Sequence, residues 1–228
     1  MYKRARSTRS FRSKRVKRVK RRAAPRRRTA LIRRVCMRIA EPKSVDYAPA
    51  KIEMYHNTIV THRLNHENTM PAQGVSDTAR VGDQIDTSHY RLRMLLGQKT
   101  DRPNVTFRWW VVSVPKGSSY SYTNWFDATT NNVLLDDPNK DFLTVHKKGY
   151  WRPNEAGLAG TGGDEYTFVK TLSIPHKRKY KFGPANAAVT HNQPDLYFII
   201  AAYDAYGSLL ADNIAYMQLA QTLYYRDP

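Results

Sequence analysis

The residues best suited to chemistry in this sequence are the lysines and arginines at its start, whose charges can bind phosphate. Residues 1–38 contain 18 Lys plus Arg and no Asp or Glu. A guanidinium group is permanently charged, pairs its N–H groups with phosphate oxygens and stacks on nucleobases. The segment is therefore predicted to bind nucleic acid. The side chains expected to do so are Arg12, Lys14, Arg15, Lys17, Arg18, Lys20, Arg21, Arg22, Arg26, Arg27, Arg28, Arg33, Arg34 and Arg38.

Nuclear import and membrane binding are two other uses to which a basic arm can be put. Clusters such as Lys20-Arg21-Arg22 also serve as nuclear-import signals, and that use is compatible with nucleic-acid binding. A membrane-surface helix is disfavoured, because the few apolar residues of the arm form a poor stripe before Pro25 interrupts it. No apolar run reaches the 18 or so residues of a membrane span, so we expect no membrane insertion.

Sequence motifs for catalysis or metal binding are lacking. There is no Gly-x-Ser-x-Gly, and the one glycine-rich stretch lacks the lysine of a phosphate-binding loop. The seven histidines are scattered and Cys36 is the single cysteine, which disfavours a zinc site. Asp137, Asn139 and Asp141 resemble the start of a calcium loop, but Phe142 occupies the position of its glycine. The sequence therefore predicts a protein that is not an enzyme and has no cofactor and no metal.

The rest of the chain is almost neutral. The whole chain has 38 basic and 19 acidic side chains, so residues 39–228 hold 20 basic and 19 acidic ones. A dense run of like charges with few apolar side chains cannot offset the entropy lost on folding. We expect residues 1–40 to be a mostly disordered arm and residues 41–228 to form a single domain, which is long enough for one core.

The composition of that domain favours strands. It contains most of the 15 Tyr, 4 Trp and 7 Phe of the chain, with Val, Ile and Thr in short runs. The regions that alternate or are continuously apolar are 51–63, 89–96, 105–114, 142–151, 165–175, 195–206 and 213–225. An irregularity near His56-Asn57 is expected within the first, and residues 105–114, apolar on nearly both faces, suggest a central strand.

Seven or eight strands with connections too long for simple hairpins predict an all-β fold. The favoured architecture is an eight-stranded antiparallel jelly-roll sandwich that follows the basic arm, and an immunoglobulin-like sandwich is the alternative. An α/β enzyme is disfavoured, because no amphipathic helices of 10–15 residues alternate with the strands.

Three groups of side chains in the domain are candidates for function. Arg91 and Arg93 share one strand face and could line the interior of an assembly or contact nucleic acid, with a solvated or interface face as the alternative. The cluster of Lys177, Arg178, Lys179 and Lys181 could face nucleic acid or acidic cell-surface glycans. The aromatic side chains Tyr120, Tyr122, Trp125 and Phe126 fall in an expected loop, where an exposed cluster would mark a subunit interface.

A basic arm joined to an aromatic-rich β domain resembles the capsid proteins of small circular single-stranded DNA viruses, circovirus-like in the broad sense. The likeness covers nearly the whole chain, but it is carried by strand and turn signatures. They are Arg80-Val81-Gly82-Asp83-Gln84-Ile85 with Tyr90-Arg91-Leu92-Arg93, residues 132–143, residues 197–204 with Asp212-Asn213-Ile214-Ala215, and Leu223-Tyr224-Tyr225-Arg226-Asp227-Pro228.

This resemblance implies a single jelly roll that self-assembles into a small icosahedral T=1 shell and packages a circular single-stranded DNA genome. It also implies residence in the virion and in the host nucleus, with a host nuclear-import receptor as a partner. About 60 copies with 18 arm charges each would bring about 1,080 positive charges, enough to neutralise on the order of a thousand phosphates. The alternatives are a cellular nucleic-acid-binding protein of the ribosomal type, and a jelly-roll enzyme or lectin whose arm only directs import.

Overall fold

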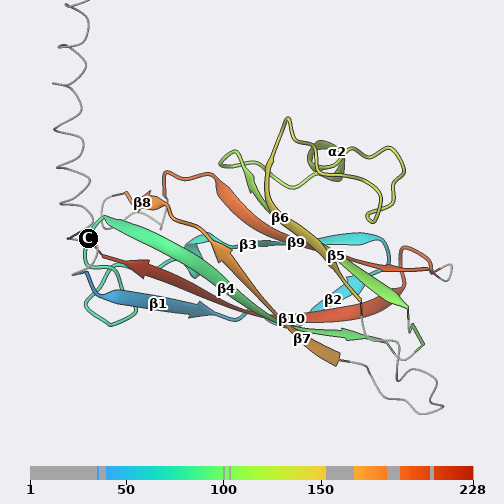
Figure 1. Cartoon of the computed structure of the whole chain (residues 1–228), viewed down its shortest axis with the longest axis horizontal. Coiled ribbons are helices and arrows are strands. Elements are labelled where there is room, and N and C mark those ends of the chain that lie inside the picture. Colours follow the sequence, from blue (N-terminus) through green and yellow to red (C-terminus); the bar gives the residue numbers. More distant parts are fainter. Residues whose placement is uncertain are drawn as a thin grey trace, which may run out of the picture. The chain divides into compact units, whose positions relative to one another are not determined.

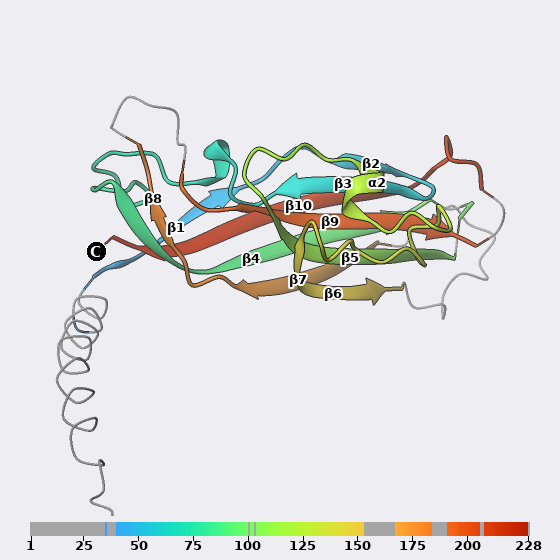
Figure 2. The ribbon, with the colours of Figure 1, turned by 90° about the horizontal axis from the view of Figure 1, so that it is seen from above.

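The computed structural model describes Val35 and residues 40–99, 101–102, 104–152, 167–183, 191–205 and 208–227. The basic arm expected at residues 1–40 therefore lies almost entirely outside the described residues, as do the glycine-rich stretch and the nucleic-acid-binding side chains named within the arm. Nearly all regular structure in the described part is antiparallel β (Figures 1 and 2).

The ten described strands form two sheets. The strands are β1 (Pro42–Tyr47), β2 (Ile52–Tyr55), β3 (Thr58–Arg63), β4 (Gln84–Gln98), β5 (Val105–Val114), β6 (Thr144–Trp151), β7 (Thr167–Pro175), β8 (Lys179–Lys181), β9 (Asp195–Asp204) and β10 (Asn213–Arg226). A six-stranded sheet has the order β1-β10-β4-β7, with β2 also paired to β10 and β8 to β4. A four-stranded sheet has the order β3-β9-β5-β6.

This strand order is that of a jelly roll. If β1 with β2, and β7 with β8, are each taken as one interrupted strand, the chain builds two sheets of four strands and crosses repeatedly between them. The first and last strands, β1 and β10, are neighbours in one sheet. An immunoglobulin-like sandwich places its first and last strands in different sheets. The prediction of an antiparallel jelly roll is therefore confirmed, and the alternative sandwich is excluded.

The region expected as one strand over 51–63 is divided between the two sheets. β2 pairs with β10, whereas β3 pairs with β9. The chain turns at Asn57, which has a φ of 54°, a backbone region that asparagine tolerates better than most residues. The Asn57 side chain donates to the Asn131 carbonyl and accepts from the Val133 N–H. The irregularity expected near His56-Asn57 is thus the corner at which the chain changes sheets.

The main core lies between the two sheets. Tyr90, Leu92, Met94 and Leu96 alternate along β4 and are fully buried, as the two-residue period predicts. Side chains from the facing strands β5 and β9 complete this cluster. Each fully buried Leu, Phe or Met side chain contributes about 1.5–3 kcal/mol.

A second core covers the other face of the four-stranded sheet. The segment between β5 and β6, which contains the short helix α2 (Tyr122–Trp125), lies over that face in Figure 1. Its Trp125 and Phe126 pack with Trp110 and Val112 of β5 and with Ile199 of β9. β5 is therefore buried on both faces and central in its sheet, which confirms the expectation for 105–114.

The aromatic cluster expected to be exposed at residues 120–126 is largely internal. Trp125 and Phe126 are 0% and 1% exposed, so the expectation that they form a subunit interface is wrong. Their rings fill the second core because the apolar outer face of β5 has to be covered. Tyr120 is 38% exposed and Tyr122 is partly buried, and for these two residues contact with another subunit stays a prediction. No described helix is long and apolar enough to cross a membrane.

Candidate nucleic-acid interface

The outer face of the six-stranded sheet, opposite to the main core, is the surface on which basic side chains gather. Because successive residues of a strand point to opposite sides, burial of Tyr90, Leu92 and Met94 places Arg91 and Arg93 on this outer face. Both arginines are exposed. The period of the sequence thus predicted the face of each arginine correctly.

The short strand β8 brings two further cations to the same face. It pairs with the beginning of β4, with Ile85 opposite Tyr180. Both of these side chains are fully buried, so the residues on either side of Tyr180, Lys179 and Lys181, point away from the core. The sequence alone could not predict this pairing, because β8 lies about 90 residues after the beginning of β4.

The rest of the basic cluster lies beside this sheet. Lys177 and Arg178 are exposed in the turn between β7 and β8. The Arg178 and His176 carbonyls accept hydrogen bonds from the Thr87 hydroxyl at 3.1 and 2.6 Å, which fastens the turn to β4. The two basic groups that the sequence predicted in the domain therefore meet on and beside one sheet.

Few acids oppose these charges. Asp46 on β1 accepts a hydrogen bond from the Thr222 hydroxyl at 2.6 Å, and Asp86 lies opposite Lys179 and Arg226 in the strand register. Within the part of the chain that the structure describes, no ion pair or side-chain hydrogen bond involves Arg91 or Arg93. Their guanidinium groups are therefore available to an external anion.

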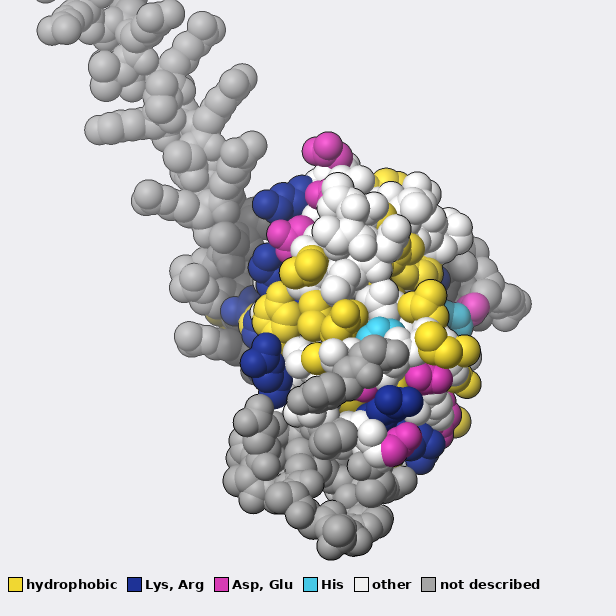
Figure 3. Space-filling view, turned by 90° about the vertical axis from the view of Figure 1, so that its right-hand side faces the viewer, with side chains coloured by type: hydrophobic (Ala, Val, Ile, Leu, Met, Phe, Trp, Pro, Cys, Tyr) yellow, Lys and Arg dark blue, Asp and Glu magenta, His cyan; other side chains and the backbone are white. Residues whose placement is uncertain are grey.

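This basic character does not extend over the whole domain. Figure 3 views the end of the sandwich that carries the β4–β5 and β9–β10 connections, and there acidic, basic and apolar side chains are interspersed. Exposed apolar side chains at this end include Leu209 and Leu210, in the connection before β10. Residues 39–228 are thus nearly neutral as a whole, although basic side chains are in local excess on the outer face of the six-stranded sheet.

An aromatic pair also lies on the outer face of the six-stranded sheet. The rings of His89 on β4 and Tyr224 on β10 stack with centroids 4.3 Å apart and an interplanar angle of 9°. Both residues are partly exposed. Aromatic rings beside cations are the combination with which proteins bind unpaired nucleic acid, because bases stack on the rings while cations bind the backbone.

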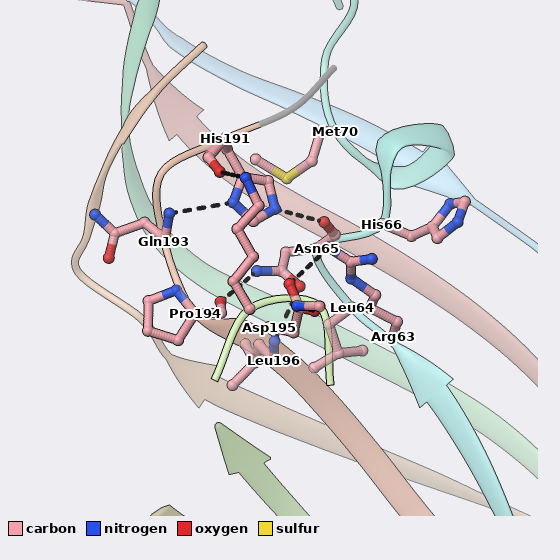
Figure 4. A network of polar contacts seen from close by, with 12 residues as sticks. Arg63, Leu64, Asn65, His66, Met70, His191, Gln193, Pro194, Asp195 and Leu196 are labelled. Atoms are coloured by element: carbon pink, nitrogen blue, oxygen red, sulfur yellow. Dashed lines mark hydrogen bonds and ion pairs between the residues drawn. The ribbon is translucent and has the colours of Figure 1, made fainter. Parts of the chain in front are cut away.

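A network of buried polar groups fixes the loops at one end of the sandwich (Figure 4). Asn65, just after β3, donates to the Pro194 carbonyl at 2.8 Å and accepts from the Leu196 N–H at 2.9 Å. Arg63 pairs with the buried Asp195 at 2.6 Å. His191 completes the network, because its ring bonds to the Asn65 carbonyl at 2.9 Å.

Two histidines near this end, His176 and His191, have lowered pKa values. Burial lowers the pKa of His191, and burial together with the nearby His146 and Arg178 lowers the pKa of His176 to about 4. His176 lies 2.9 Å from the hydroxyl of Tyr180, which packs edge-on against His191. These groups maintain the structure that presents β8. Sequence patterns could not reveal them, because their partners are distant in the chain.

The described residues contain no group of three or more His, Cys, Asp or Glu side chains that could hold a metal ion. In the turn expected to resemble a calcium loop, Asp137 pairs instead with Arg108 at 2.8 Å. Asn139 accepts a hydrogen bond from the Asp141 N–H, which is an Asx turn.

Comparison with known proteins gives fold-level similarity only. No family model matches the chain, and no curated protein matches it. Among solved structures, the native virion of Kashmir bee virus at acidic pH matches with 10% identity and a TM-score of 0.32, over 81% of this chain and 71% of the other. The T13 particle of IBDV matches with 8% identity and a TM-score of 0.29, over 82% of this chain and 36% of the other.

Merkel cell polyomavirus VP1 in complex with GD1a oligosaccharide is more distant, with 9% identity and a TM-score of 0.13. The first two of these structures are viral particles, and the third is a viral protein. At such TM-scores they do not decide the architecture, and the jelly roll is defined by the strand order of this chain itself. Jelly rolls occur in viral capsids, lectins and cupins, and these are the classes that the fold admits.

Proposed function

We propose that this chain is the structural protein of a viral capsid, whose arm binds a single-stranded DNA genome while the jelly-roll domain closes the shell. The observation that carries the proposal is the separation of charge along the chain. Residues 1–38 hold 18 of the 38 basic side chains, whereas residues 39–228 hold 20 basic and 19 acidic ones. A shell requires domains that pack closely without mutual repulsion, together with a concentrated cation for the genome.

The outer face of the six-stranded sheet supports the same division of labour. It presents Arg91, Arg93, Lys179 and Lys181, and its edge strand β1 begins at Pro42, immediately after the arm in the chain. In this proposal the face contacts packaged nucleic acid beside the arm. Binding by phosphate contacts carries little sequence preference, which suits the packaging of a whole genome.

The choice of single-stranded DNA, a shell of about 60 copies and entry into the host nucleus rests on the resemblance to circovirus-like capsid proteins. The clusters Lys20-Arg21-Arg22 and Arg26-Arg27-Arg28 are the segments of the arm proposed for the import receptor. Lys177 and Arg178 are the candidates for an acidic cell-surface glycan, because they are exposed in a turn.

Electron microscopy of the purified full-length chain tests the proposal. We expect uniform closed particles that protect long nucleic acid from nuclease. Removal of residues 1–38 should abolish nucleic-acid loading and leave the β-sheet circular dichroism unchanged. Monomers at every salt concentration and pH would overturn the proposal, and protection of short fragments only would favour a cellular nucleic-acid-binding module instead.

A further inference from the structure

The outer face of the six-stranded sheet contains a shallow hollow with an apolar floor. It has a volume of about 340 Å³, within the range of small-molecule sites. The register places Leu95 of β4 between Gln218 of β10 and Val169 of β7. The residues that line the hollow are Ala48, Arg93, Met94, Leu95, Val169, Gln218, Leu219 and Ala220.

The composition of the hollow is unusual for a solvated strand face. Val169 is 66% exposed, and it lies beside Leu95, which is partly exposed. The polar side chains among the lining residues are those of Arg93 and Gln218. Arg91 follows on the same side of β4, two residues or about 7 Å away along the strand. An apolar surface thus has one cation in its lining, Arg93, and a second, Arg91, farther along β4, and neither has a described acidic partner.

We propose that this hollow receives an unpaired base of a single-stranded nucleic acid, while Arg93 and then Arg91, which follow one another on the same side of it along β4, bind successive phosphates of the strand. This inference rests on the proposed function and deepens it. A base is flat and apolar on its faces, so it can cover Leu95 and Val169, and its polar edge can bond to the Gln218 amide. In a duplex the base faces are already covered by stacking, so a duplex can use the arginines but not the hollow.

The charges of the site favour a nucleic acid over the basic arm of the same chain as the occupant of the hollow. The basic arm of the same chain carries 18 cations and no acid, so it is repelled by Arg91 and Arg93. The stacked pair of His89 and Tyr224 lies on the same face, next to Arg91 along β4, and offers a platform for another base farther along the same strand, about 20 Å from Leu95. The strand would therefore follow β4 from the aromatic pair to the hollow.

The test uses the full-length chain and two fluorescent oligonucleotides of one sequence, one single-stranded and one in a duplex. Val169→Gln removes the apolar floor, and the matched control Val81→Gln changes a valine that is 67% exposed outside the hollow. We expect Val169→Gln to weaken single-strand binding about tenfold and duplex binding less than twofold. Val81→Gln should change neither, and Arg93→Gln should weaken both.

Gln218→Ala provides a second reading, because Gln218 is exposed and its loss removes only the contact to the base edge. It too should reduce the preference for the single strand. If Val169→Gln and Gln218→Ala still bind, and the ratio of single-strand to duplex affinity is unchanged, the hollow is not a base-binding site. The capsid proposal would then still stand. Failure of the unmodified chain to bind either oligonucleotide would instead overturn the proposed function.

Discussion

His191 donates a hydrogen bond from Nε2 to the backbone carbonyl of Asn65 at 2.9 Å, and this contact fixes the tautomer of the ring. A carbonyl can only accept, so Nδ1 carries no proton and accepts from the Gln193 N–H at 3.3 Å. The Lys116 ammonium donates to the carbonyl of His191 itself. The ring therefore fits its site only when it is neutral, with Arg63 and Lys116 nearby and Asp195 as the neighbouring acid.

This arrangement predicts that the domain loses stability in acid. Burial lowers the folded-state pKa of His191 and, to about 4, that of His176, whereas a histidine in the unfolded chain has a pKa near 6.5. Between these values the unfolded chain binds protons that the folded chain does not. The contribution of these two histidines to the free energy of unfolding is therefore complete above about pH 6.5 and is lost as the pH drops toward 4. Urea unfolding monitored by tryptophan fluorescence at pH 7, 6, 5 and 4 measures this dependence.

Replacement of the ring separates its contribution from that of the other histidines. His191→Gln retains a donor for the Asn65 carbonyl but cannot titrate, so it should flatten the acid dependence while lowering stability at pH 7. His66→Asn is the control, because His66 is a partly exposed residue that caps the short helix over Glu67–Thr69 and asparagine can still cap it. A pH profile of His191→Gln parallel to that of the unmodified chain would contradict the assignment.

The carboxylate of the ion pair between Arg63 and Asp195 is buried, so removing its cation should cost more stability than removing the cation of an exposed ion pair. The Asp195 side chain is 2% exposed, and it also accepts a hydrogen bond from the Gly117 N–H at 3.1 Å. Arg63→Met leaves a buried carboxylate without its cation and should cost about 3–5 kcal/mol. Lys148→Met breaks a pair with Asp137 in which both side chains are 58% exposed, and should cost less than about 1 kcal/mol.

Chemical denaturation measures both changes, and the double variant Arg63→Met/Asp195→Asn tests the cause. A neutral amide at position 195 needs no counter-charge, so this variant should recover part of the stability lost in Arg63→Met. If it is as unstable as Arg63→Met alone, the loss comes from packing of the arginine stem and not from the unpaired charge.

Gly149 on β6 lies against the Trp109 ring, and this contact predicts the effect of a single methyl group. A Cβ at position 149 would approach three ring atoms of Trp109 to 2.8, 3.0 and 3.2 Å. The indole is fixed because it stacks on Trp151 with centroids 5.0 Å apart. Gly149→Ala should therefore destabilise the domain by about 1–3 kcal/mol. Gly82→Ala, where nothing lies within 4 Å, should change the thermal unfolding temperature little.

Local period and composition were sufficient to predict the fold class and the faces of the long strands. The alternation in 89–96 assigned Tyr90 and Leu92 to the core and Arg91 to the outside, because the two-residue period of a strand requires no knowledge of its partners. The same reasoning could not place the change of sheet at Asn57. That corner depends on contacts with Asn131 and Val133, more than 70 residues away.

The candidate site was predictable in its residue types but not in its assembly. The sequence singled out Arg91 and the Lys179 cluster separately, and only the pairing of β8 with β4 places them on one face. The hollow could not be anticipated, because Leu95, Val169 and Ala220 come from three strands whose register is set by long-range pairing. The exposure predicted for Trp125 was wrong, because the sequence does not show that the segment between β5 and β6 covers a second core.

Arg108 joins β5 to the segment that covers the second core, and it provides a last prediction. It is 4% exposed, and its Nη1 donates to the carbonyls of Val133 and Asp136 at 3.0 Å each, while Nη2 pairs with Asp137 at 2.8 Å. Its guanidinium also lies over the ring of Trp110, 4.7 Å from the centroid. Few other groups could satisfy two buried carbonyls and a carboxylate together.

Arg108→Lys keeps the charge but loses the fork geometry, since one ammonium cannot reach all three acceptors. We expect a loss of about 2–4 kcal/mol, because buried hydrogen bonds to a charged group contribute about 1.5–3 kcal/mol each and one or more carbonyls lose their donor. Hydrogen exchange should locate the change in residues 118–143 and spare β4 and β10, whose pairing does not involve this segment. Uniform loss of protection across both sheets would show that the covering segment and the sandwich unfold as one unit.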